Sequence, residues 1–270
     1  MLIKNRFRPS STKKTQKGLF NNRADTYDEK TLNTPFWIVF GEKILQEWKQ
    51  QKKKNMIGLD VGCGTGRCAI FFSESGLEMV GTDLSLQMLK KAKEKAKSKN
   101  VHKNCEWVLV DAENLPFFKI FDFTTSFGTL HHLPTPQKAI EEISRVTKRM
   151  GHVHFVEPNS ECLPHFIVLF KILLKKIAKK CRLWKCTKKH AGVREHHLSF
   201  SPIQFETWLK RENIEPKIKT EAYRIIITPN LFPKNVSLAK AVLHVFDKFC
   251  NHLPLIRERS SILVINGIKK

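Results

Sequence analysis

The chain has 270 residues, 41% of them hydrophobic, so it is long enough for a full core and too apolar for a disordered chain. Its 48 lysines and arginines against 25 aspartates and glutamates give a net charge of +23, which predicts an anionic partner without identifying it. The seven cysteines show no zinc-ligand spacing, so we expect free thiols, no metal site and a reducing, cytoplasmic location.

Hydrophobic periodicity and composition divide the chain into four expected regions. Residues 1–26 form a polar, basic segment that we expect to be flexible. Residues 27–159 form a ligand-binding core, which begins with an amphipathic helix over about 35–50. Residues 160–214 form a basic helical insertion on the substrate side, and residues 215–270 complete the sheet.

Strand and helix patterns alternate through the core, which indicates parallel strand pairing. Strands are expected at 56–61, 78–83, 105–110, 121–126 and 152–157, and helices at 67–75, 85–99 and 137–147. A helix at 201–211, a strand at 217–223, a helix at 238–251 and a strand at 260–270 follow. The expected fold is a doubly wound, mostly parallel, seven-stranded α/β sheet with helices on both faces and a helical insertion. Ligands of such sheets bind at the carboxyl ends of the strands.

The stretch LDVGCGTGR places three glycines, Gly62, Gly64 and Gly66, where a strand turns into a helix. Bare glycines there let a ligand lie against backbone amide groups. Asp83 ends the next strand, where a carboxylate can accept both hydroxyls of a ribose. The loop alone fits a nicotinamide cofactor or another adenosine cofactor. The G-x-G-x-G spacing and a third acid, Asp111, at the end of the third strand favour the second.

Five segments together carry a resemblance to a known family: LDVGCGTGR, GTDLS, DAENLPF, SFGTLHHL and ISRVTKRMGHVHFVEPN. From about Tyr27 to Asn159 the chain resembles the class I S-adenosylmethionine-dependent methyltransferases. Within them it is similar to the broad group that includes the quinone-biosynthesis C-methyltransferases. The resemblance implies a Rossmann-like fold, S-adenosylmethionine as cofactor and methyl transfer as the activity.

The resemblance also implies which residues hold the cofactor. Asp60 and the glycine loop would hold the methionine end, Asp83 the ribose hydroxyls, and Asp111 with the next residue the adenine edge. Phe127 would lie near the sulfonium, and Tyr27 would cover the site from the amino-terminal side. The full set implied is Tyr27, Asp60, Gly62, Gly64, Gly66, Asp83, Leu84, Met88, Asp111, Ala112, Phe127 and Gly128.

Two histidine pairs can serve as a general base if the methyl acceptor must lose a proton. His196 and His197 lie in the substrate-facing half, and we predict them as the catalytic residues, with helix capping or solvent exposure as the alternative. His131 and His132 belong to the LHHL segment, which recurs in the family across different substrates. We therefore expect the second pair to shape the site.

The segment 163–194 bears on the acceptor. Residues 171–194 contain ten lysines or arginines and no acid, interleaved with large apolar residues. This composition is typical of a helix on an anionic membrane surface and favours a lipid-like or other small-molecule acceptor. A helix packed on the domain with a solvated basic face is the alternative.

Two other functions stay open. The net charge favours a nucleic-acid methyltransferase. Against this function, the chain lacks the Asn/Asp-Pro-Pro-aromatic and Pro-Cys motifs of base methylation. A non-catalytic subunit with a cofactor-binding fold is the third alternative, and the intact acids argue against it.

Overall fold

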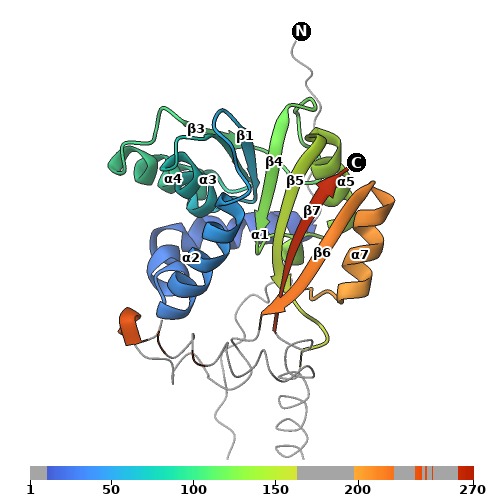
Figure 1. The fold of residues 1–270 in the computed structure, drawn as a ribbon. Coiled ribbons are helices and arrows are strands. Elements are labelled where there is room, and N and C mark those ends of the chain that lie inside the picture. Colours follow the sequence, from blue (N-terminus) through green and yellow to red (C-terminus); the bar gives the residue numbers. More distant parts are fainter. Residues whose placement is uncertain (1–10, 163–197, 222–234, 239–240, 242–244, 246–260) are drawn as a thin grey trace, which may run out of the picture.

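The computed structural model describes residues 11–162, 198–221, 235–238, 241, 245 and 261–270 (Figure 1). The helices are α1 (Ser11–Arg23), α2 (Pro35–Lys49), α3 (Arg67–Ser73), α4 (Leu86–Ser98), α5 (Pro136–Val146) and α7 (Pro202–Arg211). The strands are β1 (Ile57–Val61), β2 (Glu78–Asp83), β3 (Cys105–Leu109), β4 (Phe121–Phe127), β5 (Thr147–Pro158), β6 (Ile214–Glu221) and β7 (Ile262–Lys269). Short helical turns occupy Ala24–Thr26, Asp28–Leu32 and Leu130–His132.

The strands form one seven-stranded sheet in the order β3-β2-β1-β4-β5-β7-β6. Strands β1 to β5 pair in parallel, whereas β7 runs antiparallel to both β5 and β6. The expected fold class, a mostly parallel seven-stranded sheet of Rossmann type, is therefore confirmed. The chain order reverses between β1 and β4, and the carboxyl ends of these two strands border the crevice where such sheets bind ligands.

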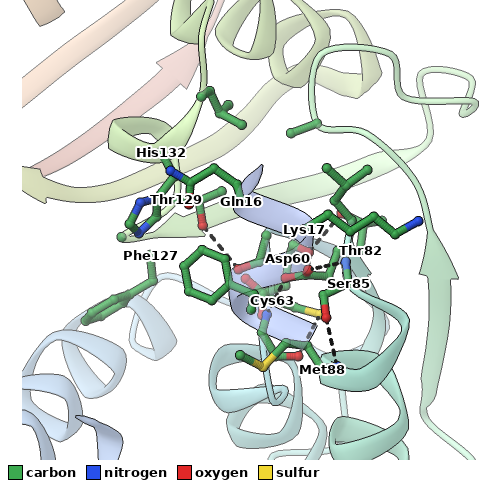
Figure 2. A pocket seen from close by; sticks show the side chains of 18 of the residues that line it. Gln16, Lys17, Asp60, Cys63, Thr82, Ser85, Met88, Phe127, Thr129 and His132 are labelled. Carbon is green, nitrogen blue, oxygen red and sulfur yellow. Dashed lines mark hydrogen bonds between the residues drawn. The ribbon is translucent and has the colours of Figure 1, made fainter. Parts of the chain in front are cut away.

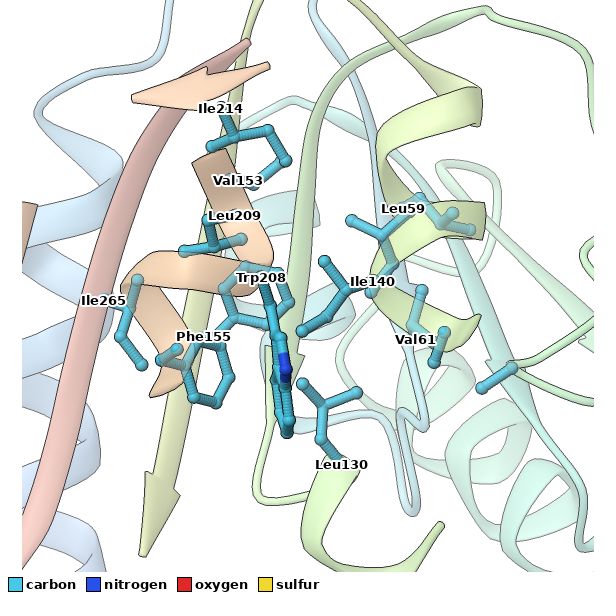
Figure 3. Packing of buried hydrophobic residues seen from close by; sticks show 14 of the residues in the cluster. Leu59, Val61, Leu130, Ile140, Val153, Phe155, Trp208, Leu209, Ile214 and Ile265 are labelled. Carbon is cyan, nitrogen blue, oxygen red and sulfur yellow. The ribbon is translucent and has the colours of Figure 1, made fainter. Parts of the chain in front are cut away.

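Both faces of the sheet are covered, because successive strand side chains point to opposite sides. On one face Leu59 and Phe155 pack with residues of α5 and α7, including Trp208 (Figure 3). On the other face Phe123 packs with residues of α2 and α3, including Trp48. These two cores fix the strand ends relative to one another.

The amino-terminal segment differs from the expectation that residues 1–26 are flexible. Residues Ser11–Arg23 form helix α1, which lies at the carboxyl ends of the central strands (Figure 1). Lys13 and Gln16 on this helix are buried although both are polar. The Nζ atom of Lys13 bonds to Asp111 Oδ2 at 2.6 Å and also to the carboxylate of Glu113. These ion pairs help to attach the helix to the core.

Several expectations fall on residues that the structure does not describe. The basic segment 163–194, His196 and His197 lie outside the described residues, as does most of the helix expected at 238–251. Of the insertion expected at 160–214, the structure describes its first three residues and 198–214, which include α7. Within the described part of the chain, no helix has the length and apolar character needed to cross a membrane.

Candidate active site

The φ angles of Gly62, Gly64 and Gly66 are positive, at 69°, 52° and 84°. Residues with a side chain rarely adopt this backbone conformation. The surroundings of the three glycines differ. A Cβ atom on Gly66 would lie 2.7 Å from the ring of Trp107, so packing requires the glycine there. A Cβ on Gly64 would meet only Tyr27 Cε1, at 3.9 Å. The bare side of Gly64 therefore faces open space in the pocket.

Asp60 lies near the end of β1 and is 1% exposed. Its carboxylate accepts hydrogen bonds from Thr125 Oγ1 at 3.0 Å and from the Ala69 amide at 3.2 Å. Burial raises the pKa of Asp60 to about 7 in spite of these bonds, and the neighbouring charge of Asp83 acts in the same direction. A cationic group bound beside Asp60 would favour its charged form.

Asp83 at the end of β2 connects the glycine loop to α4. Its Oδ2 accepts a hydrogen bond from the Gly64 amide at 2.9 Å, and its Oδ1 accepts one from the Ser85 amide at 2.8 Å. Ser85 then caps α4 by accepting from the Met88 amide. Burial raises the pKa of Asp83. Because each carboxylate oxygen has two lone pairs, Asp83 can still accept bonds from hydroxyl groups. We call Asp60, Gly62, Gly64 and Asp83 the floor of the pocket.

Helix α1 closes the pocket with a row of side chains that we call the cover: Lys13, Gln16, Lys17 and Phe20. Lys13 reaches Asp111, whose Oδ1 also accepts from the Glu113 amide at 3.0 Å. Ser85 Oγ donates to Asn21 Oδ1 at 2.6 Å and forms a second contact between α1 and the core. The cover thus engages the acid that the resemblance assigns to the adenine edge.

The turn after β4 is organised by Glu157, whose side chain is fully buried. Its Oε1 accepts from the amides of Thr129 and Leu130 at 3.0 and 2.8 Å. Its Oε2 lies 2.7 Å from His131 Nδ1. His132 lies on the pocket wall, with the ring of Phe20 at 5.1 Å in an edge contact. This turn forms part of the pocket wall.

One pocket collects nearly all of the residues that the resemblance implied (Figure 2). Those on its wall are Tyr27, Asp60, Gly62, Gly64, Asp83, Leu84, Met88, Asp111, Ala112, Phe127 and Gly128. Gly66 is not among the lining residues and instead caps the start of α3 in a left-handed conformation. The catalytic assignment of His196 and His197 stays a prediction, because both lie outside the described residues.

Sequence reasoning did not assign two features of the pocket. Arg67 lines it and directly follows the last loop glycine, and this position was a usable signal. Residues 13, 16, 17 and 20 also line it, and their spacing is that of one helical face. Periodicity of apolar residues does not detect such a stripe, because three of its four members are polar.

The chain is similar to known methyltransferases. A family of methyltransferase domains matches residues 59–155. The chain is 29% identical over 247 residues to an uncharacterized protein of Methanocaldococcus jannaschii, with 90% of each chain covered. It is 35% identical over 167 residues to a demethylmenaquinone methyltransferase of Staphylococcus haemolyticus, covering 58% of this chain and 66% of that one. Magnesium protoporphyrin IX methyltransferase of Synechocystis PCC 6803, solved with bound S-adenosylhomocysteine, superposes with a TM-score of 0.62 at 13% identity, covering 96% and 100% of the two chains.

The chain is a class I S-adenosylmethionine-dependent methyltransferase. It matches 56 to 66% of the length of three curated methyltransferases, while the last structure shares the fold along its whole length. The residues present fit the cofactor: two carboxylates, the buried Asp60 and the half-buried Asp83, flank a backbone that is open at Gly64. The two carboxylates can accept hydrogen bonds from an ammonium group and from two hydroxyls, and the bare main chain leaves room for an amino-acid tail.

Proposed function

We propose that this protein methylates a small or lipid-like acceptor that enters between the turn after β4 and helix α1. The observation that carries the proposal is the composition of the pocket described above. Its floor has the acids and open backbone that suit a nucleoside with an amino-acid tail. Its other wall is made of Phe20, Tyr27, Phe127, His132 and Leu133, which suit an apolar or aromatic molecule.

The floor residues would hold the cofactor by complementary groups. Asp60 would balance the ammonium of the methionine moiety, and Asp83 would accept bonds from the ribose hydroxyls. When bound, S-adenosylmethionine supplies a methyl group on a positively charged sulfur that a nucleophile can displace in line. The protein's own work is then to align the acceptor beside Phe127 and Gly128 and to keep water out. The cover of α1 serves the second purpose.

The curated relatives support a small acceptor. One of them bears demethylmenaquinone in its name, and it matches more than half of this chain. A pocket closed by a helix also suits a small molecule better than a nucleic-acid strand, which would need an open basic groove. The net charge of +23 is the observation that keeps RNA as a second candidate.

The decisive experiment offers the protein mixtures of possible acceptors, so that the acceptor need not be known in advance. Purified protein is incubated with methyl-labelled S-adenosylmethionine and, separately, with a lipid extract, a metabolite extract and total RNA. Mass spectrometry should find the label in a small or lipid product. Label that appears only in RNA would favour the second candidate. No transfer to any of the three, with the cofactor bound, would favour a non-catalytic subunit.

Asp83→Asn is the control for that experiment and a prediction in its own right. The amide cannot accept from two hydroxyls and from the amides of Gly64 and Ser85 as the carboxylate does, so affinity for S-adenosylhomocysteine should fall by about 1–3 kcal/mol, roughly 5-fold to 150-fold. Titration calorimetry measures the loss, and circular dichroism checks the fold. Unchanged affinity in a folded variant would remove Asp83 from the site.

We also propose that the basic segment 163–194 brings the enzyme to an anionic membrane surface, where a lipid-like acceptor would be found. Its charge and apolar residues support the idea, since each lysine or arginine near such a surface contributes about 1 kcal/mol. Co-sedimentation with anionic vesicles should be salt-sensitive and should weaken when Lys175, Lys176, Lys179 and Lys180 are changed to glutamate. Vesicle binding that is insensitive to these changes would argue against it.

A further inference from the structure

We infer, on the basis of the proposed function, that Arg67 binds the carboxylate of the cofactor's methionine moiety. Arg67 is the first residue of α3 and is one of the residues that line the pocket, directly after the glycine loop. It stands beside Phe127, with Cζ 5.4 Å from the centre of that ring. The guanidinium therefore lies at the end of the pocket where the methionine moiety is expected.

The hydrogen bonding of Arg67 is incomplete. Nη2 donates to the backbone oxygen of Trp37, but Nη1 is buried and has no hydrogen-bond partner among the described residues. Burial lowers the pKa of Arg67, although an arginine stays charged at neutral pH. A buried cation with a bare donor is costly unless an anion pairs with it. The arrangement therefore calls for an anionic ligand at Nη1.

The surroundings of Arg67 form a slot made for the guanidinium. Helix α2 has a glycine at position 41, and a Cβ atom there would collide with the Nη2 atom of Arg67. Glycine is less favourable than alanine inside a helix by about 1 kcal/mol, so Gly41 lowers the stability of α2. It lets the guanidinium lie against the backbone of α2, where Nη2 donates to the oxygen of Trp37.

Charge complementarity along the pocket identifies the anion. The methionine moiety carries one ammonium and one carboxylate, and Asp60 is the buried acid suited to the ammonium. Lys13 is paired with Asp111 and Glu113, which follow β3, three strands away from β4. Arg67 is the cation beside Phe127, at the β4 end. A carboxylate bound there would accept from Nη1 and complete its hydrogen bonding.

A comparison of two ligands isolates this contact. Decarboxylated S-adenosylmethionine keeps the nucleoside, the sulfonium and the ammonium and lacks only the carboxylate. In titration calorimetry, Arg67→Met should lower the affinity for S-adenosylmethionine about 10-fold to 100-fold, the range for a hydrogen bond to a charged group. Affinity for the decarboxylated ligand should stay the same or rise, because one repulsive charge has been removed.

Two further variants keep the test sharp. Gly41→Ala leaves Arg67 in the chain but fills its slot, so it should reproduce the selective loss, and circular dichroism checks that the variant folds. Lys17→Met removes another pocket cation and should not distinguish the two ligands. If Arg67→Met weakens both ligands equally, or neither, the assignment is wrong. If the wild-type protein binds neither ligand, the proposed function itself fails.

Discussion

The floor and the cover of the pocket are built from different contacts. In the floor, Asp83 binds the amides of Gly64 and Ser85, so backbone groups close in sequence or in adjacent strands hold the geometry. In the cover, α1 is attached by side chains, with Lys13 reaching Asp111 across 98 positions of sequence. The geometry of the floor therefore follows from the sheet, whereas the cover depends on a few side-chain contacts, the ion pairs of Lys13 among them. Substitutions in the two regions should have different consequences.

The largest effect is expected at Gly64. Gly64→Val places a branched side chain where only Tyr27 Cε1 lies within 4 Å, in the space facing the pocket. We expect a folded protein, destabilised by about 1–2 kcal/mol through the positive φ angle, that has lost S-adenosylhomocysteine binding in a titration. Gly66→Val is the matched control, and it should fail to fold because of the contact with Trp107. Retained binding by Gly64→Val would mean that the loop is only structural.

The contrast between the floor and the cover also explains which features could be predicted from the sequence. The strand expected at 78–83 is β2, Glu78–Asp83, and the three glycines follow β1 as expected, because these features depend on local periodicity and on φ angles. The burial of Lys13 could not be predicted, because a lysine is seldom buried and its partners are remote in sequence. The antiparallel direction of β7 was equally hidden, since a strand pattern carries no direction.

Asp60 allows the floor to be tested by pH. Its folded pKa is about 7 against 3.8 in the unfolded chain, so its contribution to stability is complete below pH 3.8 and is lost as the pH rises through 7. The ammonium of the ligand favours the charged carboxylate, so binding below pH 7 should release a proton. Affinity for S-adenosylhomocysteine should rise by at most about tenfold per pH unit up to pH 7 and then level off.

Calorimetry in buffers of different ionisation enthalpy measures this proton release directly. Asp60→Asn has a similar shape and no titrating group, so its binding should be weaker and free of the pH dependence below 7. A wild-type profile that is flat between pH 5.5 and 8 would separate Asp60 from the ammonium. It would also remove the reason for placing the methionine moiety between Asp60 and Arg67.

The smallest effect on affinity is expected in the cover, at Lys13. Lys13→Met leaves the carboxylates of Asp111 and Glu113 without their cation, and losing one partner of a buried pair costs about 3–5 kcal/mol. We expect this cost to appear as local opening of α1, because opening returns both carboxylates to water while the floor stays intact.

The measurements for Lys13→Met are therefore kinetic. Trypsin should cut within α1 faster than in the wild type, and S-adenosylhomocysteine should bind and leave faster in stopped-flow experiments, with a smaller change in affinity than the floor substitutions cause. Lys14→Met is the matched control, since Lys14 is the neighbouring lysine on the exposed side of α1. If the variant unfolds globally instead, or exchanges ligand no faster than the control, α1 is part of the permanent core. The distinction between a backbone-built floor and a charge-held cover would then be wrong.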